Sequence, residues 1–347
     1  MNIYRDVLYI LYRIMFQILL LICFLANALS AKTCNILSFS GAGSFGAVEV
    51  GILDKLTQTS NAPVFDMLTG VSAGGLNVGL LSYYSANNNA LFKGCGASVT
   101  SEGCFKQGIT ELKNTYFSLT NDTVFQHNTG QIARTWSYYD TAPLRKTIES
   151  KLAPLSYRGF IPIPALIGST NLNAGVFQIF EFHKESKLRQ IQIMMATSAI
   201  PLAFPPENIE GTYYVDGGAV ANEIINGVES FFEPPDMCNK YNFTFITASE
   251  GLEQVDTIDS FNDYVRRVVK VVMTDFNNEL AEIIDAPCLN NVNGETSEGA
   301  KGTIQICHPS TKGGDYLSQY SSMDFSYGKE LYEIGYNYFT CDSYNYC

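Results

Sequence analysis

Two hydrophobic patterns alternate along this chain. Short, largely apolar segments, such as those over 35–40 and 64–68, are typical of strands buried in a parallel sheet. Each segment is followed by a glycine-rich turn and then by a stretch typical of a helix, one continuing through Leu56 and the other from Gly75 to about Tyr84. Strand, turn and helix repeated in this order predict parallel strands joined by crossover helices, and therefore an α/β fold.

The same pattern continues through the rest of the chain. Thr141 is a suitable N-cap, and Pro143 in the turn that follows predicts the start of a helix. Further strands are expected over 161–168, 176–182, 213–215 and 243–247, with helices over about 188–198 and 261–284. The helix over 261–284 is amphipathic, and its apolar stripe is typical of a face that packs on a core. We expect a surface excursion over the polar segment 86–130 and a loop-rich tail beyond Cys288.

Residues 1–31 differ from this pattern. Arg5 and Arg13 precede an uncharged apolar run over 14–29, and small residues follow it as far as Ala31. A basic start, an apolar middle and a small-residue end are typical of a secretory signal peptide. The alternative is an uncleaved membrane anchor over 8–30, because the run approaches the length that spans a bilayer. Residues 32–347 show no internal repeat or low-complexity tract, so we expect them to form one domain.

Cysteine content also favours export. Cys23 lies in the apolar leader, which leaves eight of the nine cysteines for the domain. An even number of cysteines in an exported chain predicts disulfides, although the sequence does not give their pairing. Two pairs would each close a short polar loop, Cys95 with Cys104 and Cys341 with Cys347.

The net charge and the spacing of the cysteines and histidines narrow the range of possible partners. The formal net charge is −12, and the sequence has no basic run or basic patch interleaved with aromatic residues. We therefore expect neither nucleic acid nor electrostatic docking on anionic membranes, so contact with lipid must come from apolar and aromatic surface. No cysteine and histidine spacing is typical of zinc, and we expect no metal. Asn121 and Asn242 each begin an N-glycosylation acceptor sequence.

The strongest candidate for chemistry is the segment from Gly70 to Gly74, which reads Gly-Val-Ser-Ala-Gly. It fits G-x-S-x-G between a strand and a helix, the arrangement of a nucleophile elbow. A serine on such a sharp bend has strained backbone geometry, and only small neighbours let the chain pass that closely. The positive end of the following helix favours negative charge on the serine oxygen. Ser72 is therefore the predicted nucleophile, and Gly70 and Gly74 support its turn.

A second glycine-rich turn follows the first strand, from Gly41 to Gly46. It fits G-x-G-x-x-G, which occurs in dinucleotide-binding folds, and Asp66 lies about where a ribose-binding acid would. The other interpretation is an oxyanion hole, in which backbone N–H groups face a tetrahedral intermediate. The leader and the cysteines weigh against an intracellular nicotinamide cofactor, so we expect no cofactor and favour the oxyanion hole. Its predicted members are Gly41, Ala42, Gly43 and Ser44, with Gly46 supporting the turn.

The third element is Asp216, which follows the strand expected over 213–215 and precedes Gly217 and Gly218. An aspartate before glycines lies at a tight turn, where its carboxylate can face a pocket. Such pairs also mark ordinary turns, so this element has meaning only together with the other two.

In this order, the three elements resemble those of the patatin-like phospholipase family. The resemblance extends over about 34–250 and is carried by the segments 40–53, 70–77, 139–144, 198–206 and 215–218. It implies a three-layer α/β/α sandwich with a mostly parallel central sheet, and a Ser–Asp dyad without a histidine. Ser72 would attack an ester carbonyl, Asp216 would accept the proton, and an acyl-enzyme would form. The implied function is that of a lipid acyl hydrolase, a phospholipase A or a related enzyme, which contacts a membrane or micelle surface transiently. The leader and the cysteines add the expectation that it is secreted.

Two residues depart from the family pattern. Ala42 stands where the family usually has glycine, and Phe45 stands where it has a basic residue. Alanine keeps the backbone N–H but restricts the backbone, so an oxyanion role for Ala42 requires a negative φ. The loss of the basic side chain makes neutral glycerolipids candidate substrates beside phospholipids.

Two further hypotheses remain open. The order Ser72, Asp216, His308 suits the triad of an α/β-hydrolase, although His308 lies in an expected loop, where a solvated histidine is the commoner case. The protein could also be a secreted lipid-binding or storage protein that keeps the scaffold without catalysis. Covalent labelling of Ser72 by a fluorophosphonate distinguishes an enzyme from such a protein.

Overall fold

The computed structural model describes residues 33–58, 64–84, 101–130, 132–153, 163–225, 228–231, 238, 240–248 and 302–346. Three parts of the sequence predictions lie outside these residues: the leader over 1–31, the amphipathic helix over 261–284, and the pairing of Cys95 with Cys104.

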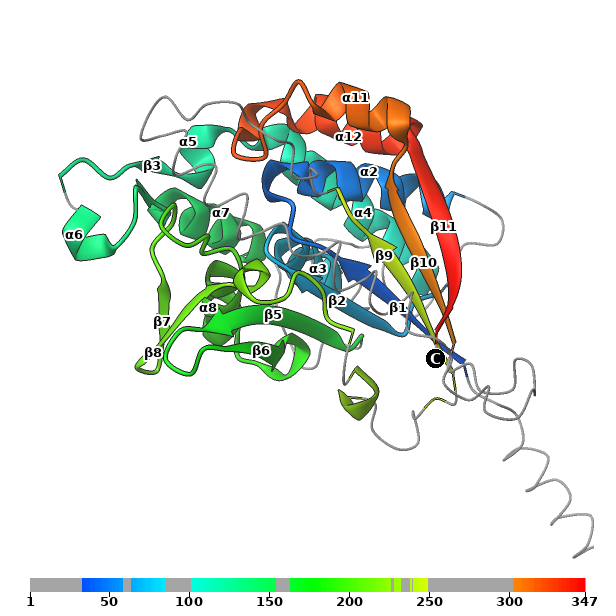
Figure 1. The fold of residues 1–347 in the computed structure, drawn as a ribbon, viewed down its shortest axis with the longest axis horizontal. Coiled ribbons are helices and arrows are strands. Elements are labelled where there is room, and N and C mark those ends of the chain that lie inside the picture. The colour runs from blue at the N-terminus through cyan, green and yellow to red at the C-terminus, as the bar shows by residue number, and fades with distance from the viewer. Residues whose placement is uncertain are drawn as a thin grey trace, which may run out of the picture.

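A mixed sheet forms the centre of the described structure (Figure 1). Its nine strands lie in the order β11-β10-β9-β1-β2-β5-β8-β7, and β6 pairs with β5. The middle of the sheet is parallel and consists of β1 (Thr33–Phe39), β2 (Met67–Val71), β5 (Ala165–Asn171), β9 (Lys240–Ile246) and β10 (Gly302–Pro309). The antiparallel strands are β6 (Val176–Glu181), β7 (Glu207–Ile209), β8 (Thr212–Asp216) and β11 (Phe339–Tyr346).

Alternating side chains of β1 divide the core into two parts. Leu37 and Phe39 point to one face of the sheet and pack in a large helix-covered cluster. Cys34 and Ile36 point to the other face, where they pack with residues of β9 and β10 and with the turn η4 (Val228–Phe231). Both faces of the sheet are therefore buried, as parallel strands require. The predicted α/β fold with a mostly parallel central sheet is confirmed.

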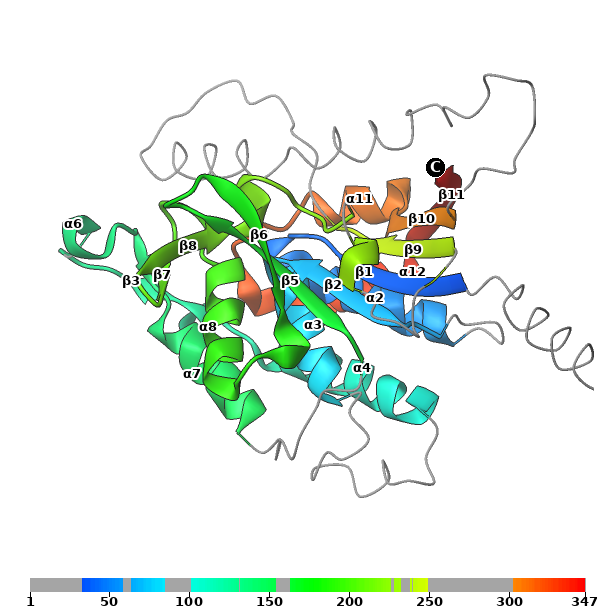
Figure 2. The ribbon, with the colours of Figure 1, turned by 90° about the horizontal axis from the view of Figure 1, so that it is seen from below.

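Most of the described helices lie on the first face (Figures 1 and 2). They are α2 (Gly46–Thr57), α3 (Ala73–Tyr84), α4 (Ser101–Ser118), α7 (Ala142–Leu152), α8 (Lys187–Thr197), α11 (Thr311–Leu317) and α12 (Gly328–Asn337). The smaller elements are η1 (Gly43–Phe45), α5 (Asn121–Val124), α6 (Ile132–Thr135), η2 (Phe182–Lys184), η3 (Gly217–Ala219) and η6 (Phe325–Tyr327), with a short ribbon of β3 (Gln126–His127) and β4 (Tyr139–Asp140).

Two regional predictions are wrong. Part of the expected polar excursion over 86–130 is the helix α4, which buries Ile109, Leu112 and Tyr116 against the core. These residues have helical spacing, but the exposed polar face between them hides the pattern. The tail beyond Cys288 is also not loop-rich where it is described, because it forms β10, α11, α12 and β11. Gly335 of α12 comes so close to α2 that a Cβ atom there would lie 2.0 Å from the carbonyl oxygen of Val48.

Most predicted element boundaries hold within about two residues, but two strands are shifted further along the chain. The strand expected over 161–168 is β5, Ala165–Asn171. The strand expected over 64–68 begins at Met67 and extends to Val71, because Val64 is exposed and Met67 pairs with Ile36 of β1. The strand therefore runs directly into Ser72. The helix after Thr141 begins at Ala142, with Pro143 in its first turn as predicted.

The described cysteines form two disulfides, Cys34 with Cys238 and Cys307 with Cys341. The suggested pairing of Cys341 with Cys347 is wrong, because Cys341 lies directly opposite Cys307 in the register of β10 and β11. Asn242, which begins the second glycosylation acceptor sequence, lies within β9. None of the helices within the described ranges has the length and apolar content needed to cross a bilayer.

Candidate active site

Ser72 stands on a sharp bend between β2 and α3. Its φ is 54°, in the left-handed region that side chains other than glycine rarely adopt. The strain predicted for a nucleophile elbow is therefore present. Gly70 and Gly74 allow the bend: a Cβ atom on Gly70 would lie 2.4 Å from the Gly74 oxygen, and one on Gly74 would lie 2.4 Å from the Phe39 oxygen. α3 starts at the next residue, Ala73, so its positive end lies at Ser72.

A threonine from α8 fixes the bend from the other side. The backbone N–H of Ser72 donates to Thr197 Oγ1 over 2.8 Å, and Thr197 Oγ1 donates to the Gly168 oxygen over 2.5 Å. Thr197 is fully buried, so both hydrogen bonds are shielded from water. One side chain thus joins the elbow to the neighbouring strand β5.

Asp216 lies at the end of β8, level with the elbow. Val71 pairs with Gly168 of β5, and the next residue of β5, Ser169, pairs with Asp216. Ser72 Oγ donates to Asp216 Oδ2 over 2.6 Å, a short bond of the kind seen between a hydroxyl and a carboxylate. The two predicted catalytic side chains are therefore in direct contact, although they are 144 residues apart.

Burial changes the acidity of Asp216. The side chain is fully buried, and desolvation raises its pKa to about 7, against the opposing effect of the hydrogen bonds from Ser72 and from the Gly218 N–H. The Gly218 bond, 2.9 Å to Oδ1, also fixes the orientation of the carboxylate. A carboxylate with a pKa near neutrality is a stronger base than one in water, which suits a proton acceptor.

The first glycine loop lies against the elbow, and its four predicted oxyanion donors are not equivalent. The Gly41 N–H donates to Asn222 Oδ1 over 3.0 Å, and the Ser44 N–H donates to the Ser322 oxygen over 2.7 Å. Within the described part of the chain, the N–H groups of Ala42 and Gly43 make no hydrogen bond. The φ of Ala42 is −146°, so the alanine fits the loop without strain. A Cβ atom on Gly41 would lie 2.9 Å from Ser72 Cβ, which shows how closely the loop approaches the nucleophile.

Gly46 and Gly217 have related packing roles. A Cβ atom on Gly46 would lie 2.2 Å from the Tyr116 hydroxyl, and one on Gly217 would lie 2.7 Å from Val71 Cγ1. These glycines let α2 approach α4 and let the turn after Asp216 approach β2. Phe45, which replaces a basic residue of the family pattern, is fully buried and brings no charge to the site.

Behind the loop lies a buried polar network around Glu49 of α2. Ser40 Oγ donates to Glu49 Oε1 over 3.0 Å, and Asn77 Nδ2 donates to Glu49 Oε2 over 3.1 Å. Asn77 in turn accepts a 2.8 Å bond from the Tyr116 hydroxyl. Burial raises the pKa of Glu49 well above its ordinary value, in spite of these hydrogen bonds. The network joins the residue before the glycine loop to the helix after the nucleophile.

The three histidines do not contact the dyad within the described structure. His308 lies at the end of β10, not in the expected loop, with its ring nitrogens at Pro309 O and Asp342 Oδ2. β10 is separated from β2 by two strands, so the backbones are roughly 14 Å apart. His183 bonds to Ala165 at the start of β5, and His127 packs on Tyr138 and Tyr139. The described geometry thus offers a Ser–Asp pair and no triad.

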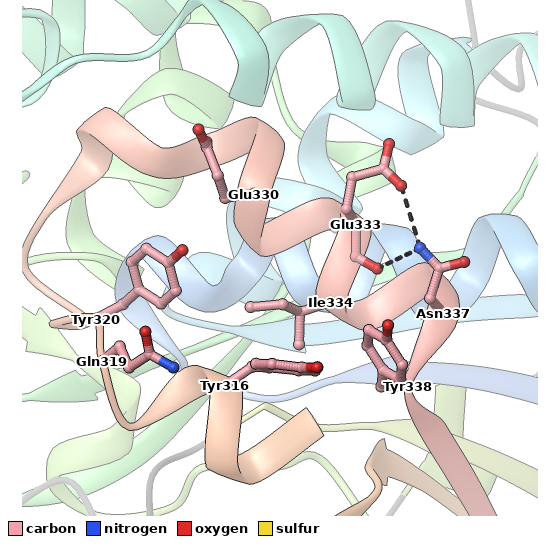
Figure 3. Close-up of a pocket in the computed structure, with 8 residues that line it drawn as sticks. All are labelled: Tyr316, Gln319, Tyr320, Glu330, Glu333, Ile334, Asn337 and Tyr338. Atoms are coloured by element: carbon pink, nitrogen blue, oxygen red, sulfur yellow. Dashed lines mark hydrogen bonds between the residues drawn. The ribbon is translucent and has the colours of Figure 1, made fainter. Parts of the chain in front are cut away.

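A pocket of about 280 Å³ between α11 and α12 does not include the dyad (Figure 3). It is lined by Tyr316, Gln319, Tyr320, Glu330, Glu333, Ile334, Asn337 and Tyr338. Two of the lining residues have partners within the fold: Lys312 Nζ lies 4.7 Å from the Tyr338 ring centroid, and the Asn337 amide donates to Glu333. The described residues hold no cluster of histidine, cysteine or acidic side chains suited to a metal ion.

Sequence reasoning missed three residues that position the site: Thr197, Asn222 and Ser322. Thr197 and Asn222 are buried polar residues. Their only signal in the sequence was their position close to the segments 198–206 and 215–218, which carry the family resemblance. Ser322 gave no signal, because it acts through its carbonyl oxygen and lies in the tail, about 280 residues after the loop it contacts.

The chain is similar in sequence to known proteins over about half of its length. The model of the patatin-like phospholipase family matches residues 37–229, more than half of the chain. A cGAMP-activated phospholipase of Vibrio cholerae is 28% identical over 208 residues, which cover 54% of each chain. A cGAMP-activated phospholipase of Escherichia coli is 26% identical over 215 residues, which cover 56% of this chain and 55% of the other.

These similarities have limits of extent and depth. The chain spans about half the length of the curated relatives it matches. The crystal structure of VipD from Legionella pneumophila covers 89% of this chain and 68% of that chain, but with 12% identity and a TM-score of only 0.36. The family match includes the glycine loop, the elbow and Asp216, the three elements that come together in the fold. The chain therefore belongs to the patatin-like phospholipase family.

Proposed function

We propose that the protein is an exported serine lipid acyl hydrolase that cleaves ester lipids through an acyl-enzyme on Ser72. The observation that carries this proposal is the 2.6 Å hydrogen bond between Ser72 Oγ and Asp216 Oδ2 in a buried site. Membership of the phospholipase family supports a lipid as the substrate.

The first half of the reaction follows from the orientation of these groups. Ser72 Oγ attacks the ester carbonyl carbon while its proton passes to Asp216 Oδ2. The carbonyl oxygen gains negative charge, which the unpaired N–H groups of Ala42 and Gly43 stabilise together with the positive end of α3. The tetrahedral intermediate then collapses, the bond to the leaving alcohol breaks, and the alcohol oxygen takes the proton from Asp216.

The second half repeats these steps with water. Asp216 accepts a proton from a water molecule, which attacks the acyl carbon and gives a second tetrahedral intermediate. Its collapse releases the fatty acid and returns the proton to Ser72 Oγ. The chain thus needs only one carboxyl group, which is protonated and deprotonated once in each half-reaction.

Export is the second part of the proposal. The leader over 1–31 and the two disulfides, Cys34 with Cys238 and Cys307 with Cys341, support it, because stable disulfides form in oxidising compartments. If the leader is retained, the same domain is held at a membrane through residues 8–30. Mass determination of the N-terminus of the protein from the producing cell distinguishes the two forms.

A fluorophosphonate probe and a mixed lipid extract test the enzymatic part. We expect the probe to label Ser72, and we expect fatty acids and a deacylated lipid to appear when the protein is incubated with the extract. The identity of the deacylated lipid decides between phospholipids and neutral glycerolipids. Absence of both labelling and release would support a lipid-binding or storage protein on this scaffold.

A further inference from the structure

Four large apolar side chains are exposed on and just after α6, on the turn between α8 and β7, and just after β8. Trp136 is 57% exposed, Leu202 54%, Ile132 49% and Val220 43%. Side chains of this size are usually buried, and a group of them on one part of a surface commonly marks a binding surface. We call these four residues the apolar patch.

The backbone holds two of these side chains outward. Trp136 has a φ of 57° and Leu202 a φ of 67°, both in the left-handed region, where a bulky residue is strained and glycine is not. Tyr138 N–H donates to the Leu202 oxygen over 2.8 Å, so the two strained segments are bonded to each other. Backbone strain of this kind clusters at functional segments, so these two residues are candidates for a function.

The patch is continuous with the dyad through short connections. The backbone N–H of Asp216 donates to the Ala199 oxygen, and Leu202 is only three residues further on, within about 11 Å of extended chain. Val220 follows Asp216 by four residues, and its N–H bonds to the Gly217 oxygen. The Trp136 ring contacts Tyr213 of β8 at a centroid distance of 5.4 Å. α6 and the β7–β8 hairpin lie at the same end of the molecule in both views (Figures 1 and 2).

We propose that the apolar patch docks the protein on a lipid surface and so presents the dyad to lipid esters. This inference rests on the proposed function. A tryptophan with aliphatic neighbours is the composition that prefers the boundary between water and lipid. The charge of the whole chain is −12, so apolar contact has to supply most of the attraction to a membrane. Arg134, between Ile132 and Trp136, is exposed and makes no ion pair with another described residue, so its guanidinium is available to a phosphate headgroup.

The chain provides its own probe for this proposal, because Trp136 is its single tryptophan. The experiment uses the full chain with Ser72→Ala, which prevents turnover, and phosphatidylcholine vesicles with or without brominated acyl chains. We expect a blue shift of Trp136 emission on the vesicles and quenching by the brominated lipid. Leu202→Ser and Ile132→Ser in this background should each weaken vesicle binding about tenfold, the effect of exposing one aliphatic side chain.

Val64→Ser is the matched control. Val64 is 67% exposed but lies before the N-terminal end of β2, whereas Ser72 follows the C-terminal end of that strand. We expect its binding to equal that of the parent. Trp136→Ala in the otherwise natural chain should lower hydrolysis of vesicle lipid about tenfold and leave hydrolysis of a soluble short-chain ester unchanged, while Trp136→Phe should restore most of the loss.

The outcomes separate docking from catalysis. No quenching by brominated lipid, or an equal loss of binding with Val64→Ser, overturns the proposal. An emission shift that depends on protein concentration and accompanies dimerisation in sedimentation also overturns it, because the patch would then be covered by a second copy. If vesicles quench Trp136 but neither ester is hydrolysed by the natural chain, docking stands and the proposed hydrolase function fails.

Discussion

Asn222 and Gly41 are joined by two hydrogen bonds, although they are 181 residues apart in the sequence. The Gly41 N–H donates to Asn222 Oδ1 over 3.0 Å, and Asn222 Nδ2 donates to the Gly41 oxygen over 3.2 Å. Asn222 follows Asp216 by six residues, so a single segment supplies the proton acceptor and the clamp on the glycine loop. Asn222 therefore links the position of Asp216 to that of the loop that carries the Ala42 and Gly43 N–H groups, beside the contact of Ser44 with Ser322.

Asn222→Asp should disturb the loop without removing a catalytic group. The variant keeps an acceptor for the Gly41 N–H but places a carboxylate oxygen against the Gly41 carbonyl. We expect kcat to fall about 10- to 100-fold with a small change in KM, because loop position matters most when the oxyanion forms. Steady-state kinetics on a soluble ester measure the changes in kcat and KM separately. Asn337→Ala, which removes an exposed amide of α12, should change neither constant. An unchanged kcat in Asn222→Asp would refute the positioning role.

Substitutions of the dyad should be far more severe. Ser72→Ala removes the nucleophile and Asp216→Asn removes the base, so each should lower kcat/KM about 10³-fold or more. His308→Ala should keep most of the activity, because the His308 ring bonds to Asp342 and Pro309. Rates on a soluble ester, with the melting temperature of each variant as the folding control, provide the test. Loss of activity in His308→Ala alone would restore the triad hypothesis.

Activity should depend on pH through Asp216. Burial raises the pKa of this carboxyl to about 7, and only its charged form can accept the Ser72 proton. We therefore expect kcat/KM to rise tenfold per pH unit below that value and to level off above it. The profile should be repeated with His308→Ala, where we expect no change because the His308 ring does not contact the dyad. A flat profile from pH 5 to 9 would contradict the assignment of Asp216 as the base.

The buried Glu49 should make stability depend on pH. Its pKa is raised above the ordinary 4.5, so in the folded state it keeps a proton that the unfolded chain releases. This contribution to stability is complete below about pH 4.5 and is lost as the pH rises towards the folded pKa, at most about 1.4 kcal/mol per unit. Glu49→Gln removes the titration. The free energy of unfolding of the variant, relative to that of the natural chain, should therefore increase from pH 5 to pH 8. Urea unfolding at both pH values measures the difference, with exposed Glu330→Gln as the control.

The sequence predicted those parts of the fold in which local pattern and tertiary structure agree. β2, Ser72 and α3 lie in consecutive residues, and the elbow geometry needs only its small neighbours Gly70 and Gly74 to be recognised. The contact of Asp216 with Ser72 was implied only by the family resemblance, because it depends on the register of β2, β5 and β8. The strand that carries Cys307 and the helix that carries Leu112 were missed, because polar exposed faces obscure their buried residues.

The roles of single groups were harder to predict than their positions. Four N–H groups of the glycine loop were expected as oxyanion donors, but Gly41 and Ser44 already donate to Asn222 and Ser322. Ser322 lies in the C-terminal tail, so the pattern of the loop itself could not reveal that a distant carbonyl occupies one of its donors. Hydrogen-bond partners far apart in sequence are set by the whole fold, and short motifs do not contain them.

The elbow glycines give the last test, because they separate packing from catalysis. A Cβ atom on Gly74 would lie 2.4 Å from one carbonyl oxygen and 2.5 Å from the next, and both belong to the backbone of Phe39 and Ser40, which cannot rotate away. Gly74→Ala should therefore destabilise the fold by about 3 kcal/mol, the upper range for overpacking, and move Ser72 away from Asp216. Gly314→Ala is the matched control, since nothing lies within 4 Å of its Cβ position and α11 there is helical, so it should stabilise by up to about 1 kcal/mol. Denaturant unfolding and fluorophosphonate labelling of both variants decide the matter: if Gly74→Ala unfolds like the parent and labels at the same rate, the close approach of the elbow to β1 is not what holds the nucleophile in place.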